Sequence, residues 1–161
     1  MDGQKALIRL SMSEPKQLKR GKKFQKIVQN DFEQYSKDGK VTSEAFISFI
    51  GLEKVRKNSG RMDIFIKELG DFVTIVEIKA TDWDKIKKKN IKRNLYRHQK
   101  QLFNYIDKYI EVDRLDVCLG IIYPKPPIKK GLRNLIEKHL DEKYGVPTYW
   151  YSEIKSDEIL R

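Results

Sequence analysis

Cysteine is nearly absent from the chain, since Cys118 is the only one among 161 residues. No intramolecular disulfide can form, which suits a reducing compartment, and we expect a cytoplasmic protein. Histidine is almost as rare, with only His98 and His139. Structural zinc sites are built from several Cys and His ligands, so this composition argues against one. Cys118 lies in the apolar run 118–122 and is predicted to be a small core residue.

Long apolar runs are also missing. No stretch approaches the roughly 18 apolar residues that a membrane-spanning helix requires. Near the N-terminus the only apolar run is Ala6-Leu7-Ile8, which is too short for the core of a signal peptide. We therefore expect a soluble protein with no membrane partner. The length favours one compact domain, with residues 1–20 as an N-terminal arm and residues 21–161 as the domain.

Acidic residues are fewer than basic ones. The chain has 34 Lys and Arg against 23 Asp and Glu, which gives a net charge of +11. Such an excess favours polyanionic partners, nucleic acid first and an anionic membrane second. A membrane-surface role needs an amphipathic helix with an exposed apolar face, which the pattern does not provide. The alternative is a lysine-rich surface that serves only solubility.

Hydrophobic periodicity predicts an alternation of helices and strands. From Gly21, apolar residues recur at steps of three and four, as on one face of a helix. The apolar runs at 61–67 and 72–80 flank the turn signal Gly70-Asp71 and predict an antiparallel hairpin. The rest of the pattern predicts a strand at 41–50, a long helix around 91–109, a strand at 117–123, a helix at 132–140 and a strand at 148–151. This order indicates an α/β fold with a mixed sheet.

Three polar residues of the predicted hairpin form the pattern of a phosphodiesterase site. Side chains alternate along a strand, so Glu77 and Lys79 share one face, and Asp63 is the only acid on the partner strand before the turn region. Two adjacent carboxylates are ligands that Mg²⁺ prefers. A lysine beside them can orient the attacking water or neutralise charge on the phosphoryl oxygens. The alternative is that Glu77 and Lys79 form an ion pair of little consequence.

Three short motifs, in this order, resemble those of the PD-(D/E)XK nuclease superfamily. They are Gly60-Arg61-Met62-Asp63, Val76-Glu77-Ile78-Lys79-Ala80-Thr81 and Gln101-Leu102-Phe103-Asn104-Tyr105. The last is similar to the Q-x-x-x-Y motif of the RecB-like and exonuclease branches. The predicted elements are similar to that superfamily's restriction endonuclease-like αβββαβ core, a central mixed sheet flanked by helices. The resemblance spans about residues 21–151.

The resemblance implies a catalytic role for each matching residue of the hairpin. Asp63 and Glu77 match the two acidic metal ligands, and the backbone carbonyl of Ile78 matches a further ligand. Lys79 matches the catalytic lysine. The implied cofactor is Mg²⁺, or Mn²⁺ in its place.

The helical motifs match less closely. Gln101 and Tyr105 match the pair that reaches the substrate phosphate or braces the site, although core packing is the alternative for Tyr105. Met62 stands where the motif name has proline. In the first helix, relatives often carry Gly-x-x-x-Glu with the glutamate directed at the metal, whereas this chain has Gln25 at that position. Glutamine keeps an oxygen but loses the charge, which puts metal binding and turnover in doubt.

Basic residues gather at the start and on the exposed side of the long predicted helix. Arg93, Arg97 and Lys100 follow helical spacing and form one ridge. This pattern indicates a surface that contacts nucleic-acid phosphates, and a solvated lysine face is the alternative. The predicted binding residues are Lys88, Lys89, Lys92, Arg93, Arg97 and Lys100.

These observations predict a magnesium-dependent deoxyribonuclease, taken as an endonuclease, that hydrolyses DNA phosphodiester bonds with a metal-activated water. By the resemblance its products would carry 5′-phosphate and 3′-hydroxyl ends. The alternative is a non-catalytic nucleic-acid-binding protein on a decayed nuclease fold, disarmed at Gln25. The pattern leaves DNA against RNA, endonuclease against exonuclease, and a homodimer open.

Overall fold

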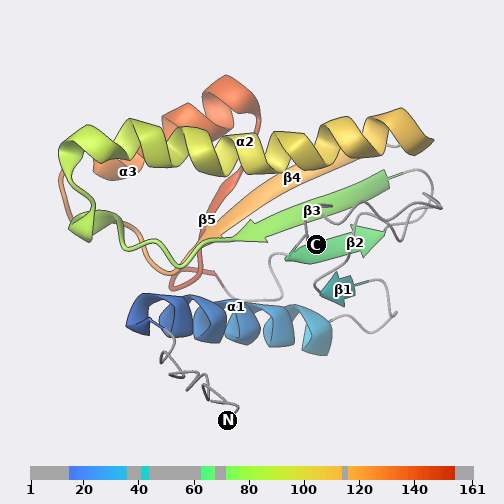
Figure 1. The fold of residues 1–161 in the computed structure, drawn as a ribbon, viewed down its shortest axis with the longest axis horizontal. Helices are drawn as coiled ribbons and strands as arrows, with labels where there is room; N and C mark the ends of the chain where they lie inside the picture. Colours follow the sequence, from blue (N-terminus) through green and yellow to red (C-terminus); the bar gives the residue numbers. More distant parts are fainter. Residues whose placement is uncertain (1–14, 36–40, 44–62, 68–71, 114–115, 155–161) are drawn as a thin grey trace, which may run out of the picture.

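Five strands form one mixed sheet at the centre of the computed structural model, which describes residues 15–35, 41–43, 63–67, 72–113 and 116–154 (Figure 1). The elements in chain order are α1 (Lys16–Tyr35), β1 (Val41–Ser43), β2 (Ile64–Lys67), β3 (Phe72–Ile78), the 3-10 turn η2 (Trp83–Lys85), α2 (Lys88–Asp113), β4 (Asp116–Tyr123), α3 (Leu132–Glu137), the π-helical turn η3 (Lys138–Glu142) and β5 (Thr148–Trp150). The α/β class and the αβββαβ order, which α3 and β5 extend, are confirmed.

The strands lie side by side in the order β1-β2-β3-β4-β5. The pairs β1–β2 and β2–β3 are antiparallel, which confirms the predicted hairpin, and Ile64 lies opposite Val76. The pairs β3–β4 and β4–β5 are parallel. A parallel neighbour requires a crossover connection, and α2 provides it between β3 and β4. The carboxyl end of β3 therefore lies close to α2.

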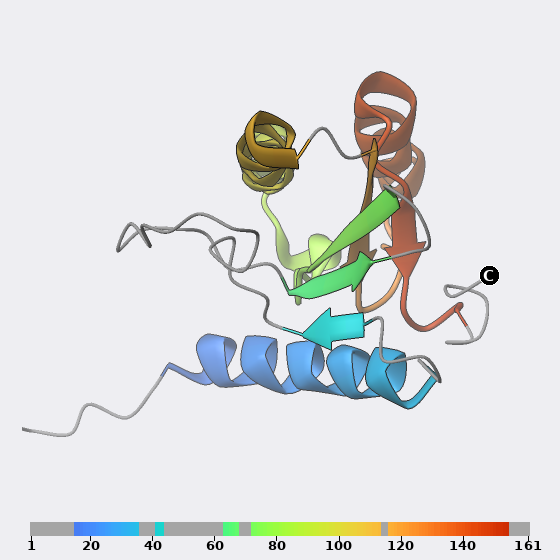
Figure 2. The ribbon, with the colours of Figure 1, turned by 90° about the vertical axis from the view of Figure 1, so that its right-hand side faces the viewer.

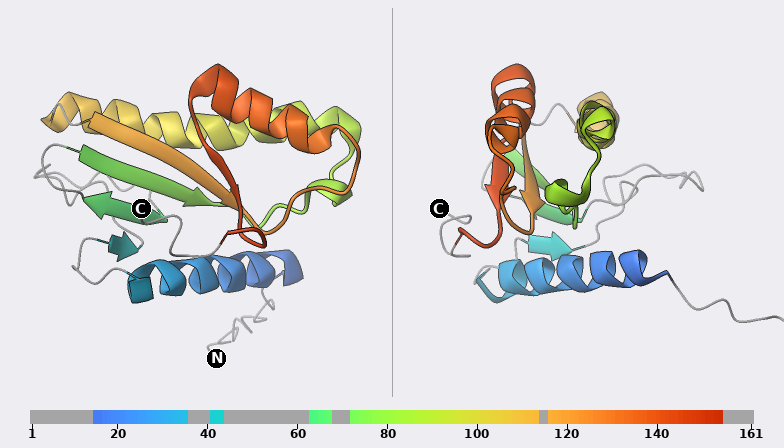
Figure 3. Two further views of the ribbon diagram at one scale, coloured as in Figure 1. Left: turned by 180° about the vertical axis from the view of Figure 1, so that it is seen from behind. Right: turned by 90° about the vertical axis from the view of Figure 1, so that its left-hand side faces the viewer.

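Helices cover both faces of the sheet. α1 lies against one face, while α2 and α3 lie against the other (Figures 1 and 2). The views in Figure 3 show the same three layers from behind and from the opposite end. A side chain at the end of β3 can therefore meet α1 on one side of the sheet and α2 on the other.

Alternation along β3 divides the core into two clusters. Ile75 points into the larger cluster with α2 and α3, which includes Leu95 and Leu102. Val76 and Ile78 point into the smaller cluster with α1. The members of the smaller cluster are Val28, Phe32, Ile64, Ile66, Val76, Ile78 and Ile122. Glu77 belongs to the α2 side by this alternation, so a charged residue projects into the apolar layer.

The element boundaries differ in places from the sequence pattern. α1 begins at Lys16, five residues before Gly21, because the carbonyl of Pro15 accepts hydrogen bonds from the backbone N–H groups of Leu18 and Lys19. β1 covers Val41–Ser43 of the strand predicted at 41–50, and residues 44–50 lie outside the described residues. The helix predicted at 132–140 is α3 followed by η3. Gly145 then adopts a φ of +64°, as expected of a residue that ends a helix.

The prediction that Cys118 is a core residue is wrong. Cys118 lies in β4 opposite Thr74, and its side chain is exposed. An apolar run predicts a buried strand, but this part of the sheet face extends past the residues that pack on α1. Among the described residues, no helix combines the length and the apolar character needed to cross a bilayer.

Candidate active site

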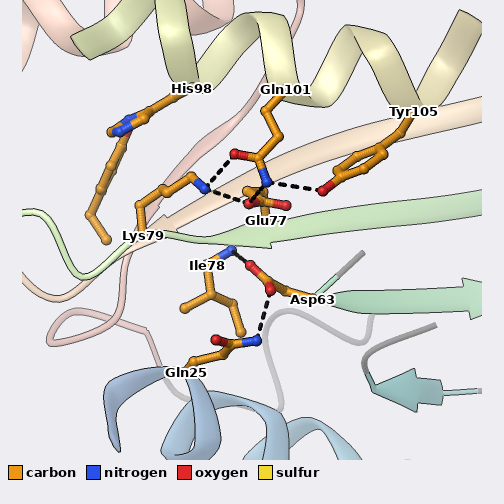
Figure 4. A network of polar contacts seen from close by, with 9 residues as sticks. Gln25, Asp63, Glu77, Ile78, Lys79, His98, Gln101 and Tyr105 are labelled. Carbon is orange, nitrogen blue, oxygen red and sulfur yellow. Dashed lines mark hydrogen bonds and ion pairs between the residues drawn. The ribbon is translucent and has the colours of Figure 1, made fainter. Parts of the chain in front are cut away.

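Asp63 lies immediately before β2 and is held by three hydrogen bonds. The backbone N–H of Ile78 donates to its Oδ2 at 2.7 Å, and the Gln25 amide donates to its Oδ1 at 2.8 Å. The Gln29 amide donates to its main-chain oxygen at 2.9 Å. Both glutamines come from α1, so this helix and β3 together fix the carboxylate at the end of the sheet (Figure 4).

Glu77 of β3 is almost completely buried, with 1% of its surface exposed. Its Oε1 accepts two hydrogen bonds, from Lys79 Nζ at 2.5 Å and from the Gln101 amide at 2.5 Å. Its Oε2 is buried and has no hydrogen-bond partner among the described residues. One oxygen of this carboxylate is thus saturated, and the other is available to a ligand.

The surroundings of Glu77 disfavour its charge. Burial raises its pKa, the negative charge of Asp63 raises it further, and the ammonium of Lys79 lowers it, which leaves a value of about 7. A carboxyl group with a pKa near neutrality is half protonated at physiological pH. The raised pKa thus reflects a poorly solvated site in which the two acids repel each other.

Gln101 of α2 connects the helix to the end of β3 through hydrogen bonds. Its Oε1 accepts a hydrogen bond from Lys79 Nζ at 2.7 Å. Its amide nitrogen donates to Glu77, and also to the hydroxyl of Tyr105 at 2.9 Å. Tyr105 is buried, and burial together with the charge of Glu77 raises the pKa of its phenol. Figure 4 shows both α2 side chains pointing toward Glu77. Tyr105 thus packs in the core and also contacts the polar cluster.

His98 lies beside this cluster on the same helix. Its Nδ1 is 2.9 Å from the hydroxyl of Tyr123. Burial lowers its pKa to about 3, with smaller contributions from the charges of Lys79 and Arg97. The imidazole is therefore neutral near pH 7.

The structure brings all six predicted catalytic residues together. Four elements or their ends supply them: α1, the residue before β2, the end of β3, and α2 (Figure 4). The residues are Gln25, Asp63, Glu77, Lys79, Gln101 and Tyr105. Their catalytic roles, and that of the Ile78 carbonyl, stay predictions.

The donor groups do not form a metal site made of protein ligands alone, but they suit a magnesium ion that also binds water and phosphate. Among the residues that the structure describes, no group of three or more His, Cys, Asp or Glu side chains could hold a metal. Asp63 and Glu77 are two carboxylates, and Glu77 Oε2 is an unpartnered buried oxygen. Mg²⁺ is commonly held by one or two carboxylates together with water and substrate phosphates. The residues present therefore suffice for an ion that is completed by its substrate.

Gln29 is the site residue that the sequence pattern did not indicate. It is 7% exposed and lies one helical turn after Gln25, so both amides reach the Asp63 segment. A signal was present, because Gln29 follows the buried Val28 on the apolar stripe of α1. A buried amide beside such a stripe needs a hydrogen-bond partner.

The six predicted nucleic-acid-binding residues all lie on α2 with exposed side chains. They are Lys88, Lys89, Lys92, Arg93, Arg97 and Lys100. Their exposure is compatible with phosphate contacts and equally with solvation, so their function stays a prediction.

Comparison with known proteins gave few matches. No protein-family model matches the chain. No characterised protein sequence matches it either. One solved structure, "crystal structure of a repair endonuclease from Pyrococcus abyssi", aligns with 61% of this chain at 17% sequence identity and a TM-score of 0.36. The aligned region is 35% of that endonuclease chain, so this protein matches about a third of its length.

Proposed function

We propose that this protein is a metal-dependent nuclease of the PD-(D/E)XK type, which hydrolyses DNA phosphodiester bonds as an endonuclease. The observation that carries the proposal is the geometry around Glu77. A buried carboxylate lies within the field of Asp63, has one oxygen without a partner, and contacts Lys79. Such a site is costly to fold, and a bound divalent cation removes the cost by neutralising both acids.

Asp63, Glu77 and the Ile78 carbonyl are the residues proposed to hold the cation. When bound, Mg²⁺ or Mn²⁺ supplies an acidified water and positive charge facing the phosphate. The chain itself supplies the orientation. Gln25 and Gln29 fix Asp63, and the β3 strand carries Glu77 into a layer from which bulk water is excluded.

Lys79 is proposed to contact the scissile phosphate. An ammonium has three N–H donors, and two of them are directed at Glu77 and Gln101. The third is available for a phosphoryl oxygen or for the attacking water, and the ammonium stabilises the negative charge that develops during attack. Gln101 contacts both Lys79 and Glu77, so it is a positioning residue.

DNA is proposed as the substrate because the exposed face of α2 is strongly basic and the chain carries a net charge of +11. The products expected by the resemblance carry 5′-phosphate and 3′-hydroxyl ends. The second candidate is a non-catalytic nucleic-acid-binding protein. It is favoured by Gln25, whose amide N–H occupies Asp63 Oδ1 where a glutamate would add a negative charge.

A cleavage assay with matched variants separates the two candidates. Supercoiled, linear, single-stranded and branched DNA are incubated with Mg²⁺, with Mn²⁺ or with EDTA. We expect metal-dependent cutting of supercoiled DNA, and a loss of about 100-fold or more for Asp63→Asn, Glu77→Gln and Lys79→Ala.

Glu33→Gln and Lys23→Ala, on exposed positions of α1, are the controls and retain full activity. Binding without cutting under every metal condition would leave the non-catalytic candidate. Cutting that survives Glu77→Gln would remove the proposed site from the reaction.

A further inference from the structure

A groove of about 410 Å³ separates α2 from η3 on a part of the surface that the candidate site does not use. Its lining residues are Lys92, Leu135, Lys138, His139, Glu142 and Lys143. Lys92 and Gln101 are nine residues apart on α2, which places them on opposite flanks of the helix because a turn takes about 3.6 residues. Gln101 faces the catalytic strand, so Lys92 and the groove face away from it.

The groove is positively charged. Three exposed lysines line it against a single acid, Glu142. The pKa of His139 is lowered by burial, and then by the charges of Lys143 and Lys92, so both ammonium groups act on this imidazole. Lysine is a compact cation suited to phosphate as a point charge. The chemistry of the lining therefore favours a phosphate group.

His139 adds a polar atom without a partner. Its Nε2 is buried and makes no hydrogen bond to any residue in the described part of the chain. Its ring packs on Tyr144 with centroids 5.2 Å apart, and Lys143 Nζ lies 5.2 Å from the Tyr144 centroid. An unsatisfied buried nitrogen destabilises the fold unless a ligand contacts it. The π-helical turn η3 that carries His139 is a rare conformation that is frequent at functional sites.

We propose that this groove is a second phosphate-binding site, which holds a backbone phosphate of the same DNA that binds at the candidate active site. The proposal rests on the proposed function for its choice of ligand. Lys92, Lys138 and Lys143 neutralise the phosphate, and the neutral imidazole of His139 donates a hydrogen bond from Nε2.

The geometry of α2 sets the distance between the two sites. Nine residues correspond to roughly 13 Å along the helix, and the crossing from one flank to the other adds about 10 Å sideways. The separation is then roughly 17 Å, which a duplex spans in about five base pairs. The groove therefore extends the footprint of the protein by about half a turn of duplex beyond the cleaved bond.

Salt-dependent binding tests the groove without any cleavage. Fluorescence anisotropy in EDTA measures the affinity of the full chain for a labelled duplex of about 20 base pairs at several salt concentrations. The variant Lys92→Gln/Lys138→Gln/Lys143→Gln is compared with Lys16→Gln/Lys19→Gln/Lys23→Gln, which removes the same charge from exposed positions of α1. We expect the groove variant to lower the slope of log K against log salt by about one, as for one phosphate that is no longer neutralised, and the α1 variant to leave it unchanged.

One further comparison sharpens the result. His139→Phe keeps the ring on Tyr144 but removes Nε2, so affinity falls several-fold while the salt slope stays constant.

Equal losses for the groove and α1 variants, or wild-type affinity in His139→Phe, would overturn the proposal. So would groove mutations that weaken binding to phosphatidylserine vesicles but not to DNA. Because the assay contains no free metal, its failure is separate from that of the nuclease proposal. If the protein cleaves DNA but the groove mutations have no effect, only the groove proposal is rejected. If the groove mutations weaken binding but the protein does not cleave, only the nuclease proposal is rejected.

Discussion

Glu77 shows how one side chain can serve two purposes through its two oxygens. Lys79 and Gln101 both donate to Oε1, so the position of the carboxylate is fixed. Oε2 stays without a partner among the described residues. A buried acid held in this way is oriented before any ligand arrives, and its pKa of about 7 records the free energy of that arrangement.

The first prediction follows from this pKa. A carboxyl group whose folded-state pKa is raised from 4.5 to about 7 favours the folded state only while it is protonated. The free energy of unfolding therefore falls as pH rises from about 4.5 to 7, and it stays low above that range. Glu77→Gln removes the titration, so the variant is more stable than the wild type at pH 8 by up to about 3 kcal/mol, and similar at pH 4.5.

Chemical denaturation of both proteins at the two pH values, in EDTA, measures this difference. Glu33→Gln, an exposed acid of α1, serves as the control with no pH-dependent gain. Addition of Mg²⁺ then stabilises the wild type but not Glu77→Gln. A Glu77→Gln protein that is less stable than the wild type at pH 8 would contradict the assigned pKa.

At the scale of one residue, the sequence patterns predicted which residues meet in the site better than they predicted how buried each residue is. The motif spacing correctly placed Asp63, Glu77 and Lys79 together, because strand alternation and a hairpin determine that geometry. Gln29 was missed because nothing in the pattern tells which polar neighbour an α1 amide will meet. Cys118 was misassigned because burial depends on how far α1 extends over the sheet, and a strand's own composition does not record that.

Among the elements, α1 most clearly has two separate roles, one in packing and one in the candidate site. Its apolar residues Val28 and Phe32 pack on the sheet, and the amides of Gln25 and Gln29 hold Asp63. The periodicity of α1 and α2 made the direction of their faces predictable. Their ends were less predictable, since α1 begins at Lys16 and the helix after residue 132 changes into a π-helical turn. Helix ends are decided by a few local hydrogen bonds rather than by periodicity.

A charge introduced through α1 provides the second prediction. Gln25→Glu exchanges the N–H donor to Asp63 for a carboxylate beside Asp63. Without metal the variant is destabilised by about 1–3 kcal/mol at pH 8, because Asp63 loses a hydrogen bond and gains a like-charged neighbour. With Mn²⁺ the same charge favours the cation, and we expect affinity to rise about tenfold or more in isothermal titration calorimetry.

Gln17→Glu adds the same charge at an exposed position of α1 and is the matched control, with metal affinity unchanged. If Gln25→Glu binds Mn²⁺ no better than the wild type, Gln25 does not face the cation. If the wild type lacks nuclease activity, restored cleavage in Gln25→Glu identifies this residue as the disarming change.

At the scale of the whole molecule, the chain is strongly basic. The net charge of +11 was readable from composition, but its distribution required the fold. The pattern correctly grouped Arg93, Arg97 and Lys100 on one face of α2, since the spacing lies within a single helix. The groove between α2 and η3 joins residues more than forty positions apart, such as Lys92 and His139, and no local pattern predicts it.

The third prediction concerns the ridge formed by Arg93, Arg97 and Lys100. Neutralising all three to glutamine weakens binding to every DNA sequence alike and reduces the salt slope by about one for each phosphate that is no longer neutralised. Anisotropy titrations with two unrelated duplexes measure both quantities. An unchanged slope would mean that the ridge is a solvated face, whereas a loss confined to one duplex would indicate base recognition in place of phosphate binding.

The contact between Tyr151 and Asp31 has a consequence for the order of folding. The Tyr151 hydroxyl donates to the Asp31 carboxylate across 120 positions of the chain, whereas Gln25 and Asp63 are 38 positions apart and Glu77 and Gln101 only 24. Closing the longer loop costs about 1 kcal/mol more in chain entropy than closing the 38-residue one. During refolding, the cluster around Glu77 is therefore expected to form at a lower entropic barrier than the contact between Tyr151 and Asp31.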